Sequence, residues 1–190
     1  MALDSESRWR LVRMKRAKGE QEVNSEPVIR PATEADLTSM VEIYNYYIQN
    51  SVVTFDLDAM ALADWAEKYR WIKELGLPFI VAQSPSGQII GFAYVAPWRQ
   101  KAAFKRTVED SIYLRPAAIG KRVGTKLLEQ LLEQAKAAGV KEVVAVISDK
   151  GAESSIALHE RFGFKHQGHL GKVGFKFGRW LGTVLMQKSL

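Results

Sequence analysis

The segment IGKRVGTKLL, residues 119–128, combines residue types that can bind a phosphate group at the start of a helix. A helix N-terminus exposes unpaired backbone N–H groups and a partial positive charge, both of which attract anions. The spacing matches neither GxxxxGK[ST] nor GxGxxG, so an ATP or NAD site is not indicated. A glycine-containing turn between a strand and a helix can also be purely structural. Within one short stretch the segment supplies two glycines, three basic side chains and a hydroxyl group: Gly120, Gly124, Lys121, Arg122, Lys126 and Thr125.

The composition excludes several other chemistries. The chain has 190 residues, the length of one domain, and contains no cysteine, so a disulfide, a thiolate metal site and a cysteine nucleophile are impossible. Its three histidines, His159, His166 and His169, lack the paired spacing of metal ligands, and we expect no metal site. No apolar run approaches the roughly 18 residues of a membrane span, and the N-terminus lacks a signal-peptide core. A cytoplasmic location without a membrane partner is therefore expected.

The positive charge of the chain is concentrated near its N-terminus. Residues 8–18 contain six basic side chains and no acidic one, which equals the whole net charge of +6. A basic arm can bind nucleic acid, but it is more often a solvated extension. Apolar residues within it suggest a short helix, and the polar residues 19–27 indicate a linker. The sequence thus predicts an extension over 1–27 and a folded domain over 28–190.

The first half of the domain predicts two helices and several strands. The sequence TEAD at 33–36 is a typical helix start, followed by apolar residues at helical spacing. A second helix is expected over about 60–75. Strands are predicted at 28–30 and 110–116, and residues 78–98 predict a β-hairpin around the turn SPSGQ.

The second half contains the most regular predicted helix, over 124–139, which Gly139 is placed to end. A buried strand at 141–148, a short helix at 154–164 and strands at 168–180 and 183–190 are expected after it. Because a hairpin is combined with helices that connect strands, the fold class is α/β or α+β with a mixed sheet.

The chain also carries a series of motifs in a distinctive order: IRPATEADL, IYNYYI, GFAYVAPWR, TVEDSIYLRP, VVAVI, LHERFGF and VGFKFGRW. Over residues 28–190 it resembles the phosphinothricin acetyltransferase-like subfamily of the GNAT N-acetyltransferase superfamily. The resemblance implies the GNAT fold, in which a mixed central sheet has two splayed parallel strands and flanking helices. It also implies acetyl-CoA as co-substrate, no metal, and a small amino-acid-like amine as acetyl acceptor, of the phosphinothricin, methionine sulfone or methionine sulfoximine type. Homodimers are common in this subfamily.

The resemblance assigns roles to individual residues. The splayed strands would be 110–115 and 141–148, with the CoA arm between them. Glu109 would be the general base that collects a proton from the amine, because only a neutral amine is nucleophilic. Its neighbour Asp110 is expected on the opposite face, because side chains alternate along a strand. His159 would protonate the CoA thiolate.

Two sets of binding residues follow from the same resemblance. Cofactor-binding positions are Ile112, Tyr113, Leu114, Gly120, Lys121, Arg122, Val123, Gly124, Thr125 and Ser155. Substrate-binding positions are Phe55, Trp98, Arg99, Phe104 and Lys176, with Lys176 or Arg99 pairing with a substrate carboxylate.

The chain departs from the subfamily pattern at five positions. Ile119 replaces a polar residue, Arg122 a glycine, Ala152 an asparagine, Gly182 an aspartate and Phe104 a tyrosine. The losses at 119 and 152 together predict about ten- to a hundredfold weaker cofactor binding, since a neutral hydrogen bond contributes about 0.5–1.5 kcal/mol. Two alternatives to an active enzyme therefore stay open. One is a catalytically weakened GNAT-fold binding or regulatory protein with an altered CoA loop, and the other is a basic-tailed nucleic-acid binder, for which the tail is the only support.

Overall fold

A computed structural model describes residues 26–190, and its elements follow the order that the sequence predicts. The predicted short helix in the basic segment 8–18 lies outside the described residues. The elements are β1 Val28–Pro31, α2 Leu37–Asn50, α3 Leu62–Glu74, β2 Phe79–Gln83, β3 Ile89–Pro97, β4 Thr107–Leu114, α4 Val123–Ala137, β5 Glu142–Ser148, α5 Glu153–Arg161, β6 Lys165–Lys176 and β7 Arg179–Ser189.

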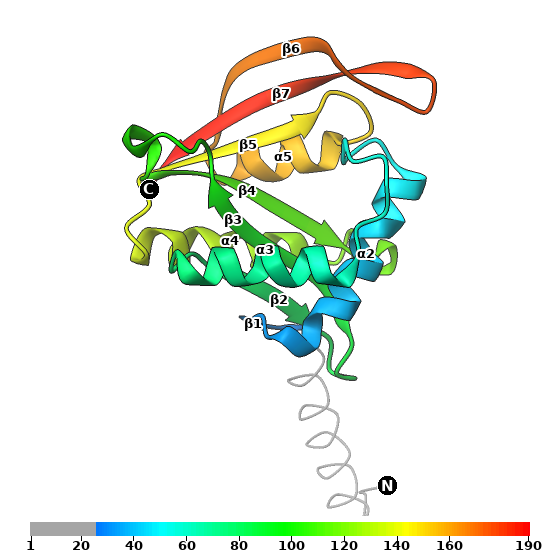
Figure 1. Cartoon of the computed structure of the whole chain (residues 1–190), viewed down its shortest axis with the longest axis vertical. Coiled ribbons are helices and arrows are strands. Elements are labelled where there is room, and N and C mark those ends of the chain that lie inside the picture. The colour runs from blue at the N-terminus through cyan, green and yellow to red at the C-terminus, as the bar shows by residue number, and fades with distance from the viewer. Residues whose placement is uncertain (1–25) are drawn as a thin grey trace, which may run out of the picture.

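The strands form one seven-stranded sheet in the order β1-β2-β3-β4-β5-β7-β6. Strands β4 and β5 are parallel, and every other neighbouring pair is antiparallel. The parallel pair is connected through α4, as a parallel crossover requires. This topology confirms the predicted mixed sheet, and Figure 1 shows its strands from β1 at the bottom to β6 and β7 at the top.

Both faces of the central strands are buried, but against different helices. In β2, Phe79 and Val81 join the core formed with α2 and α3, whereas Ile80 and Ala82 join the core formed with α4. Alternating side chains of one strand therefore serve two cores, and both cores require apolar residues. Residues 79–82, FIVA, are continuously hydrophobic for this reason rather than alternating with polar residues.

Helix α4 has the amphipathic pattern expected of a helix packed on a sheet. Its buried residues are Val123, Leu127, Leu128, Leu131, Leu132 and Ala135. The helix ends at Ala137, and Gly139 follows its C-cap as predicted, with a φ of +86° that only glycine readily adopts. The packing of these residues on the sheet fixes the position of α4, and with it the position of the first turn of the helix near β4 and β5.

The predicted strand at 168–180 is wrong in its extent, because the chain reverses within it. Strand β6 ends at Lys176, which pairs with Arg179 at the start of β7. The two residues between them form the turn, with φ of +49° at Phe177 and +72° at Gly178. Two positive φ angles in a two-residue loop match the right-handed twist of a hairpin. Asn-Gly or Gly-Gly is the usual sequence of such a turn. Here the first position is Phe177, so the sequence does not indicate the turn.

The start of α2 is held by one buried carboxylate. Asp36 accepts two hydrogen bonds from Arg30, at 2.7 and 2.8 Å, and one from the backbone N–H of Thr33 at 2.8 Å. Burial alone would raise the pKa of Asp36, but the hydrogen bonds from Arg30 and Thr33 outweigh it and lower that pKa below its usual value of 3.8. The ionised carboxylate thus ties β1 to the helix that covers the sheet.

Among residues 26–190, no helix combines the length and the apolar character that crossing a membrane requires.

Replacing Asp36 with alanine should lower the free energy of unfolding by about 1–3 kcal/mol at pH 7, because the charged bonds to Arg30 are lost. The lowered pKa means that this contribution is complete above the usual carboxyl pKa and is lost as the pH falls through the lowered value. Urea unfolding of both proteins between pH 7 and pH 3 measures the difference. A difference that stays constant over this range would contradict the account.

Candidate active site

The parallel pairing of β4 with β5 ends part of the way along both strands. The register runs from Thr107 opposite Glu142 to Glu109 opposite Val144, whereas β4 stays paired with β3 as far as Leu114. Beyond Glu109 the two strands diverge (Figure 1), and a cavity of about 490 Å³ lies along their gap. The splayed strands that the resemblance implied are confirmed.

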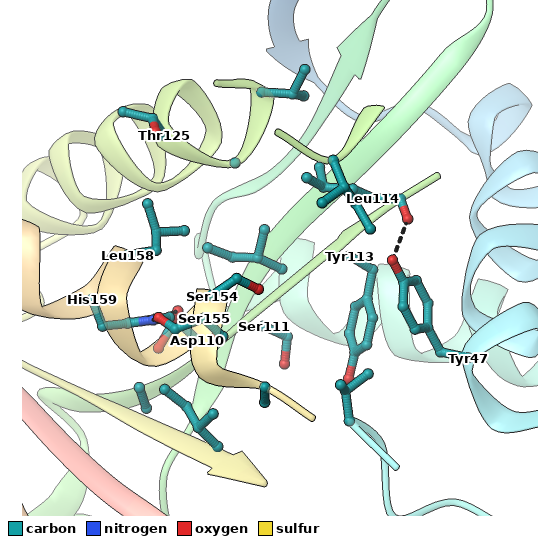
Figure 2. Close-up of a pocket in the computed structure, with 18 of the residues that line it drawn as sticks. Tyr47, Asp110, Ser111, Tyr113, Leu114, Thr125, Ser154, Ser155, Leu158 and His159 are labelled. Carbon is teal, nitrogen blue, oxygen red and sulfur yellow. Dashed lines mark hydrogen bonds and ion pairs between the residues drawn. The ribbon is translucent and has the colours of Figure 1, made fainter. Parts of the chain in front are cut away.

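The gap exposes a backbone edge of β4. The N–H of Arg115 bonds to the carbonyl of Ile90 in β3, and alternate residues of an antiparallel strand pair with the same neighbour. This alternation directs the backbone of Ile112 and Leu114 to the gap and that of Tyr113 to β3. The backbone of Tyr113 therefore pairs with β3 and is not free to bond to a cofactor in the gap, contrary to the expectation. The carbonyl of Leu114 accepts a hydrogen bond of 2.7 Å from the Tyr47 hydroxyl (Figure 2).

The first turn of α4 closes one end of the cavity. Arg122 immediately precedes the helix with φ of +60° and ψ of +9°, in the left-handed region that glycine adopts most readily. Gly120 also has a positive φ, +78°. Five of the predicted phosphate-loop residues line the cavity: Gly120, Arg122, Val123, Gly124 and Thr125. Lys121 is exposed and does not line it.

The other two departures near this loop have different settings. Ile119 lines the cavity with 52% of its surface exposed, so it offers apolar contact where the subfamily has a polar group. Ala152 is buried at the start of α5 and also lines the cavity. Its methyl group cannot make the hydrogen bond of an asparagine side chain.

His159 of α5 and Asp110 of β4 form a buried pair beside the gap (Figure 2). The His159 Nε2 lies 2.9 Å from Asp110 Oδ2, and its Nδ1 lies 2.7 Å from the carbonyl oxygen of Ser155. Because a carbonyl oxygen only accepts hydrogen bonds, Nδ1 carries a hydrogen. Burial alone would lower the pKa of His159, but Asp110 and the Ser155 carbonyl outweigh it and raise that pKa above 6.5. The charged pair is thereby favoured.

This arrangement changes the expected role of His159. Both ring nitrogens are engaged, and the side chain is only 4% exposed. To protonate a thiolate directly, the imidazole would have to break one of these bonds. While both bonds are kept, His159 orients Asp110 and has no free ring nitrogen.

Glu109 lies on the other face of β4, as the strand alternation predicts. It stands opposite Ala96, on the face that packs against α2 and α3, and it also lines the cavity. Burial, and next the charge of Asp110, raise the pKa of Glu109 above 4.5, and the charge of Lys68 partly opposes them. A half-buried carboxylate with a raised pKa is a better proton acceptor near neutral pH than an exposed one.

The cation on the Glu109 face is Lys68 of α3. Its Nζ donates a hydrogen bond of 2.7 Å to the Tyr94 hydroxyl and lies over the rings of Trp65 and Tyr94, at 5.2 and 4.6 Å from their centres. The amphipathic pattern of residues 60–75 gave no sign of this contact, because Lys68 occurs there as an ordinary polar residue.

The expected substrate residues do not line this cavity. Lys176 is buried and donates a hydrogen bond of 2.9 Å to the carbonyl of Thr54, so its ammonium group already has a partner within the protein. The Phe55 ring packs against Gly174, where a Cβ would meet it at 2.3 Å. Arg99 is exposed and stacks on Trp98 at 5.2 Å.

Phe104 is exposed in the segment between β3 and β4. The loop therefore leaves Phe104 and Arg99 accessible from solvent, next to the strand that carries Glu109.

The departure at Gly182 has a structural explanation. Asp149, which follows β5, accepts hydrogen bonds from the Gly182 N–H at 2.9 Å and from His169 at 3.0 Å. A Cβ on Gly182 would lie 2.5 Å from Asp149 Oδ2 and 2.5 Å from the carbonyl oxygen of Leu170. Asp149 therefore occupies the space of a side chain at 182 and supplies a carboxylate there.

The sequence indicated most of this cavity but missed two of its features and one cation on the Glu109 face. Glu109, His159, Ile112, Tyr113, Leu114 and Ser155 all line it, together with the five loop residues above. Missed were the pairing of Asp110 with His159, the closure of the Leu114 carbonyl by Tyr47, and Lys68. Each depends on contacts between residues far apart in sequence, which no local motif reveals. Among residues 26–190, no group of three or more His, Cys, Asp or Glu could hold a metal ion.

Replacing Arg122 with glycine should raise the free energy of unfolding by about 1 kcal/mol, because a residue with a Cβ is strained at this φ by about 1–2 kcal/mol. Lys121→Gly is the matched control. Lys121 has no positive φ, so glycine there should lower stability by about 0.4–1 kcal/mol through a more flexible unfolded chain. Urea unfolding measures both, and equal losses in the two variants would refute the strain at Arg122.

The chain matches the family model described as Acetyltransferase (GNAT) family over residues 40–164. It is 38% identical to an L-methionine sulfoximine/L-methionine sulfone acetyltransferase of Pseudomonas aeruginosa, covering 85% of this chain and 94% of that protein. It is 34% identical to a phosphinothricin N-acetyltransferase of Alcaligenes faecalis, covering 85% and 82%.

Solved structures give the same result. A GNAT superfamily phosphinothricin acetyltransferase from Sinorhizobium meliloti, in complex with acetyl-CoA, superposes with a TM-score of 0.83 at 42% identity and covers 87% of this chain and 89% of that one. An acetyltransferase from Salmonella typhimurium with its cofactor acetyl-CoA gives 0.84 at 35% identity, covering 87% and 95%. With a split sheet, a glycine-containing turn before α4 and these relatives, the chain belongs to the GNAT acetyltransferase family.

Proposed function

We propose that this protein transfers the acetyl group of acetyl-CoA to the primary amine of a small amino-acid-like molecule. The observation that carries the proposal is the cavity between β4 and β5, which has anion-binding groups at one end and Glu109 at the other. The relatives named above act on phosphinothricin or on methionine sulfoximine and sulfone. These molecules are amino acids, so the same class of acceptor is proposed here.

The residues present fit acetyl-CoA. The first turn of α4 offers backbone N–H groups and the side chains of Arg122 and Thr125 to a diphosphate. The gap-facing backbone of Ile112 and Leu114 can bond to the amide-containing arm. When bound, acetyl-CoA supplies an acetyl group activated as a thioester. A backbone N–H at the edge of β4 is suited to stabilising negative charge on the carbonyl oxygen during transfer.

The left-handed backbone at Arg122 also supports an active enzyme over a weakened binding protein. Arg122 has the left-handed backbone conformation that glycine adopts readily, and its side chain adds a positive charge beside the proposed diphosphate position. No contact among the described residues favours the alternative of a regulatory protein.

Glu109 is the proposed general base. An amino-acid amine is largely protonated at neutral pH, and it becomes nucleophilic only when a base removes that proton. Glu109 lies beside the point where β4 and β5 separate, and burial raises its pKa. Arg99 is the remaining candidate for the acceptor's carboxylate, because it is exposed, whereas Lys176 is engaged with Thr54.

The proposal also includes a domain organisation and a cellular location. We propose residues 28–190 as the catalytic domain and residues 1–27 as a basic extension and linker. A cytoplasmic location agrees with the absence of cysteine from the sequence.

Replacing Glu109 with glutamine should lower kcat at neutral pH by about a hundredfold or more, since general base catalysis contributes about 10²–10⁴. Affinity for acetyl-CoA should stay nearly unchanged. In the wild type, activity should rise with pH through a pKa above 4.5, because the ionised form is the base. Thiol release with L-methionine sulfone and L-phosphinothricin as acceptors measures this. Full activity of Glu109→Gln would remove Glu109 from the base role.

A homodimer is the proposed oligomeric state, through the β6–β7 hairpin. This hairpin forms one edge of the sheet and exposes more than half of the surface of five apolar residues: Leu170, Val173, Phe175, Phe177 and Trp180. Apolar surface of this kind commonly marks an interface, and an unpaired edge strand can pair with a copy of itself.

Light scattering of the intact chain should give twice the monomer mass. Phe175→Asp should shift the protein towards monomer, whereas Trp71→Gln, at an exposed aromatic residue of α3, should not. A wild-type monomer at micromolar concentration would contradict the proposal.

A further inference from the structure

Residues 51–56, which follow α2, connect this helix to the β6–β7 hairpin, and we call them the bridging segment. Their contact with α2 is made by Tyr44, whose hydroxyl lies 3.0 Å from Thr54 Oγ1 and donates a hydrogen bond of 2.5 Å to Asp56 Oδ2. Tyr44 belongs to the core on the Glu109 face of the sheet. The bridging segment is therefore fixed to the side of the sheet that carries the proposed general base.

The hairpin holds the same segment through two residues of β6 (Figure 1). The Lys176 Nζ donates a hydrogen bond of 2.9 Å to the carbonyl of Thr54, and only 4% of this lysine is exposed. The Phe55 ring occupies the space beside Gly174, where a Cβ would lie 2.3 and 2.4 Å from two ring atoms. Because side chains alternate along a strand, Phe175 between them points outward and is exposed. The inner face of β6 thus contacts two neighbouring residues of the bridging segment.

The bridging segment also forms part of the cavity wall. Ser51 and Val53 line the cavity, and Val52 between them is buried. A Cβ at Gly151, which follows β5, would lie 3.5 Å from the Val52 side chain, so the segment also packs against the β5 side of the gap. Because these residues directly precede Thr54, a shift of the Thr54 backbone would move the cavity wall.

The two faces of the sheet indicate which reactant this wall contacts. The phosphate loop precedes α4, and α4 packs on the opposite face of the sheet from α2 and α3. The proposed cofactor is therefore held from the α4 face, and the amine must approach Glu109 from the α2–α3 face. The bridging segment, which is fixed to α2 and lines the cavity, forms a wall on that side.

Resting on the proposed function, we infer that Lys176 and Gly174 are positioning residues for the amine acceptor, because they hold the bridging segment that forms the acceptor-side wall of the cavity. Lys176 acts through the Thr54 carbonyl rather than by pairing with the acceptor. Gly174 acts through Phe55, since only a residue without a Cβ leaves room for the ring. The acceptor site then depends on the hairpin, although none of residues 165–189 lines the cavity.

The first test compares Gly174→Ala with Gly168→Ala. The new methyl group at 174 must displace the Phe55 ring, whereas nothing lies within 4 Å of a Cβ at Gly168 in the same strand. Gly174→Ala should raise KM about tenfold for the acceptor that the wild type acetylates, L-methionine sulfone or L-phosphinothricin, which is within the loss that a misplacement of about 1 Å can cause. Gly168→Ala should leave this KM unchanged. Affinity for acetyl-CoA, measured by calorimetry, should be unaffected in both variants.

A double-mutant cycle with Phe55→Leu shows whether the effect passes through the ring. Leucine is smaller than phenylalanine, so the methyl group at 174 no longer meets a ring in this background. The increase in KM caused by Gly174→Ala should therefore largely disappear when Phe55→Leu is also present. A purely structural role would not give this result, because a partly unfolded protein has fewer active molecules and a lower apparent kcat but an unchanged KM.

Lys176→Met keeps the test decisive where Gly174→Ala does not fold. Methionine fits an apolar setting but has no donor for the Thr54 carbonyl, so the acceptor KM should rise about three- to tenfold, as expected for one lost hydrogen bond. Lys172→Met, at an exposed lysine of the same strand, is the matched control and should leave the acceptor KM unchanged.

The inference is wrong if the acceptor KM is unchanged in Gly174→Ala or, where that variant does not fold, in Lys176→Met. It is also wrong if Gly174→Ala raises the KM equally with and without Phe55→Leu, or if affinity for acetyl-CoA falls as much as the acceptor KM rises. All of these results leave acetyl transfer by the wild type, and so the proposed function, intact. A wild type that releases no thiol with either acceptor would remove the proposed function and the inference together.

Discussion

The loss of pairing between β4 and β5 after Glu109 is the constraint on which the rest of this structure depends. A sheet that stayed closed would bond the backbone of Ile112 to β5 and leave no cavity. An open sheet must have both strands supported from elsewhere. Strand β4 keeps its pairing with β3 up to Leu114, and β5 keeps its pairing with β7 through Ser148. The split is stable because each strand retains one complete neighbour.

The two faces of β4 place different charged groups in the site. Alternation places Glu109 on the α2–α3 face with Lys68 and Tyr94, and Asp110 on the α5 face with His159. The first face holds a carboxylate with a raised pKa, and the second holds a charge-balanced pair. Neighbouring acidic residues can therefore take different roles, because the strand separates their environments. The negative charge of Asp110 also helps to raise the pKa of Glu109.

Much of this could be predicted from the sequence, since the relevant signals are local. The amphipathic pattern of 124–139 predicted α4, Gly139 its end, and the motifs TVEDSIYLRP and IGKRVG the strand and turn at the cavity. The predictions that failed concern a turn without its usual residues and a contact between residues far apart in the sequence. The turn at Phe177–Gly178 was missed because a phenylalanine occupies a left-handed position. The burial of Lys176 against Thr54 could not be foreseen, because the two residues meet only in the folded chain.

Hydrogen exchange of the intact protein with and without acetyl-CoA tests the central claim most directly, namely that the cofactor arm lies along the open edge of β4. The account predicts slower exchange at the amides of Ile112 and Leu114 and in the first turn of α4, with β1 and β2 unchanged. Saturating acetyl-CoA that leaves the exchange of these amides unaltered would contradict it.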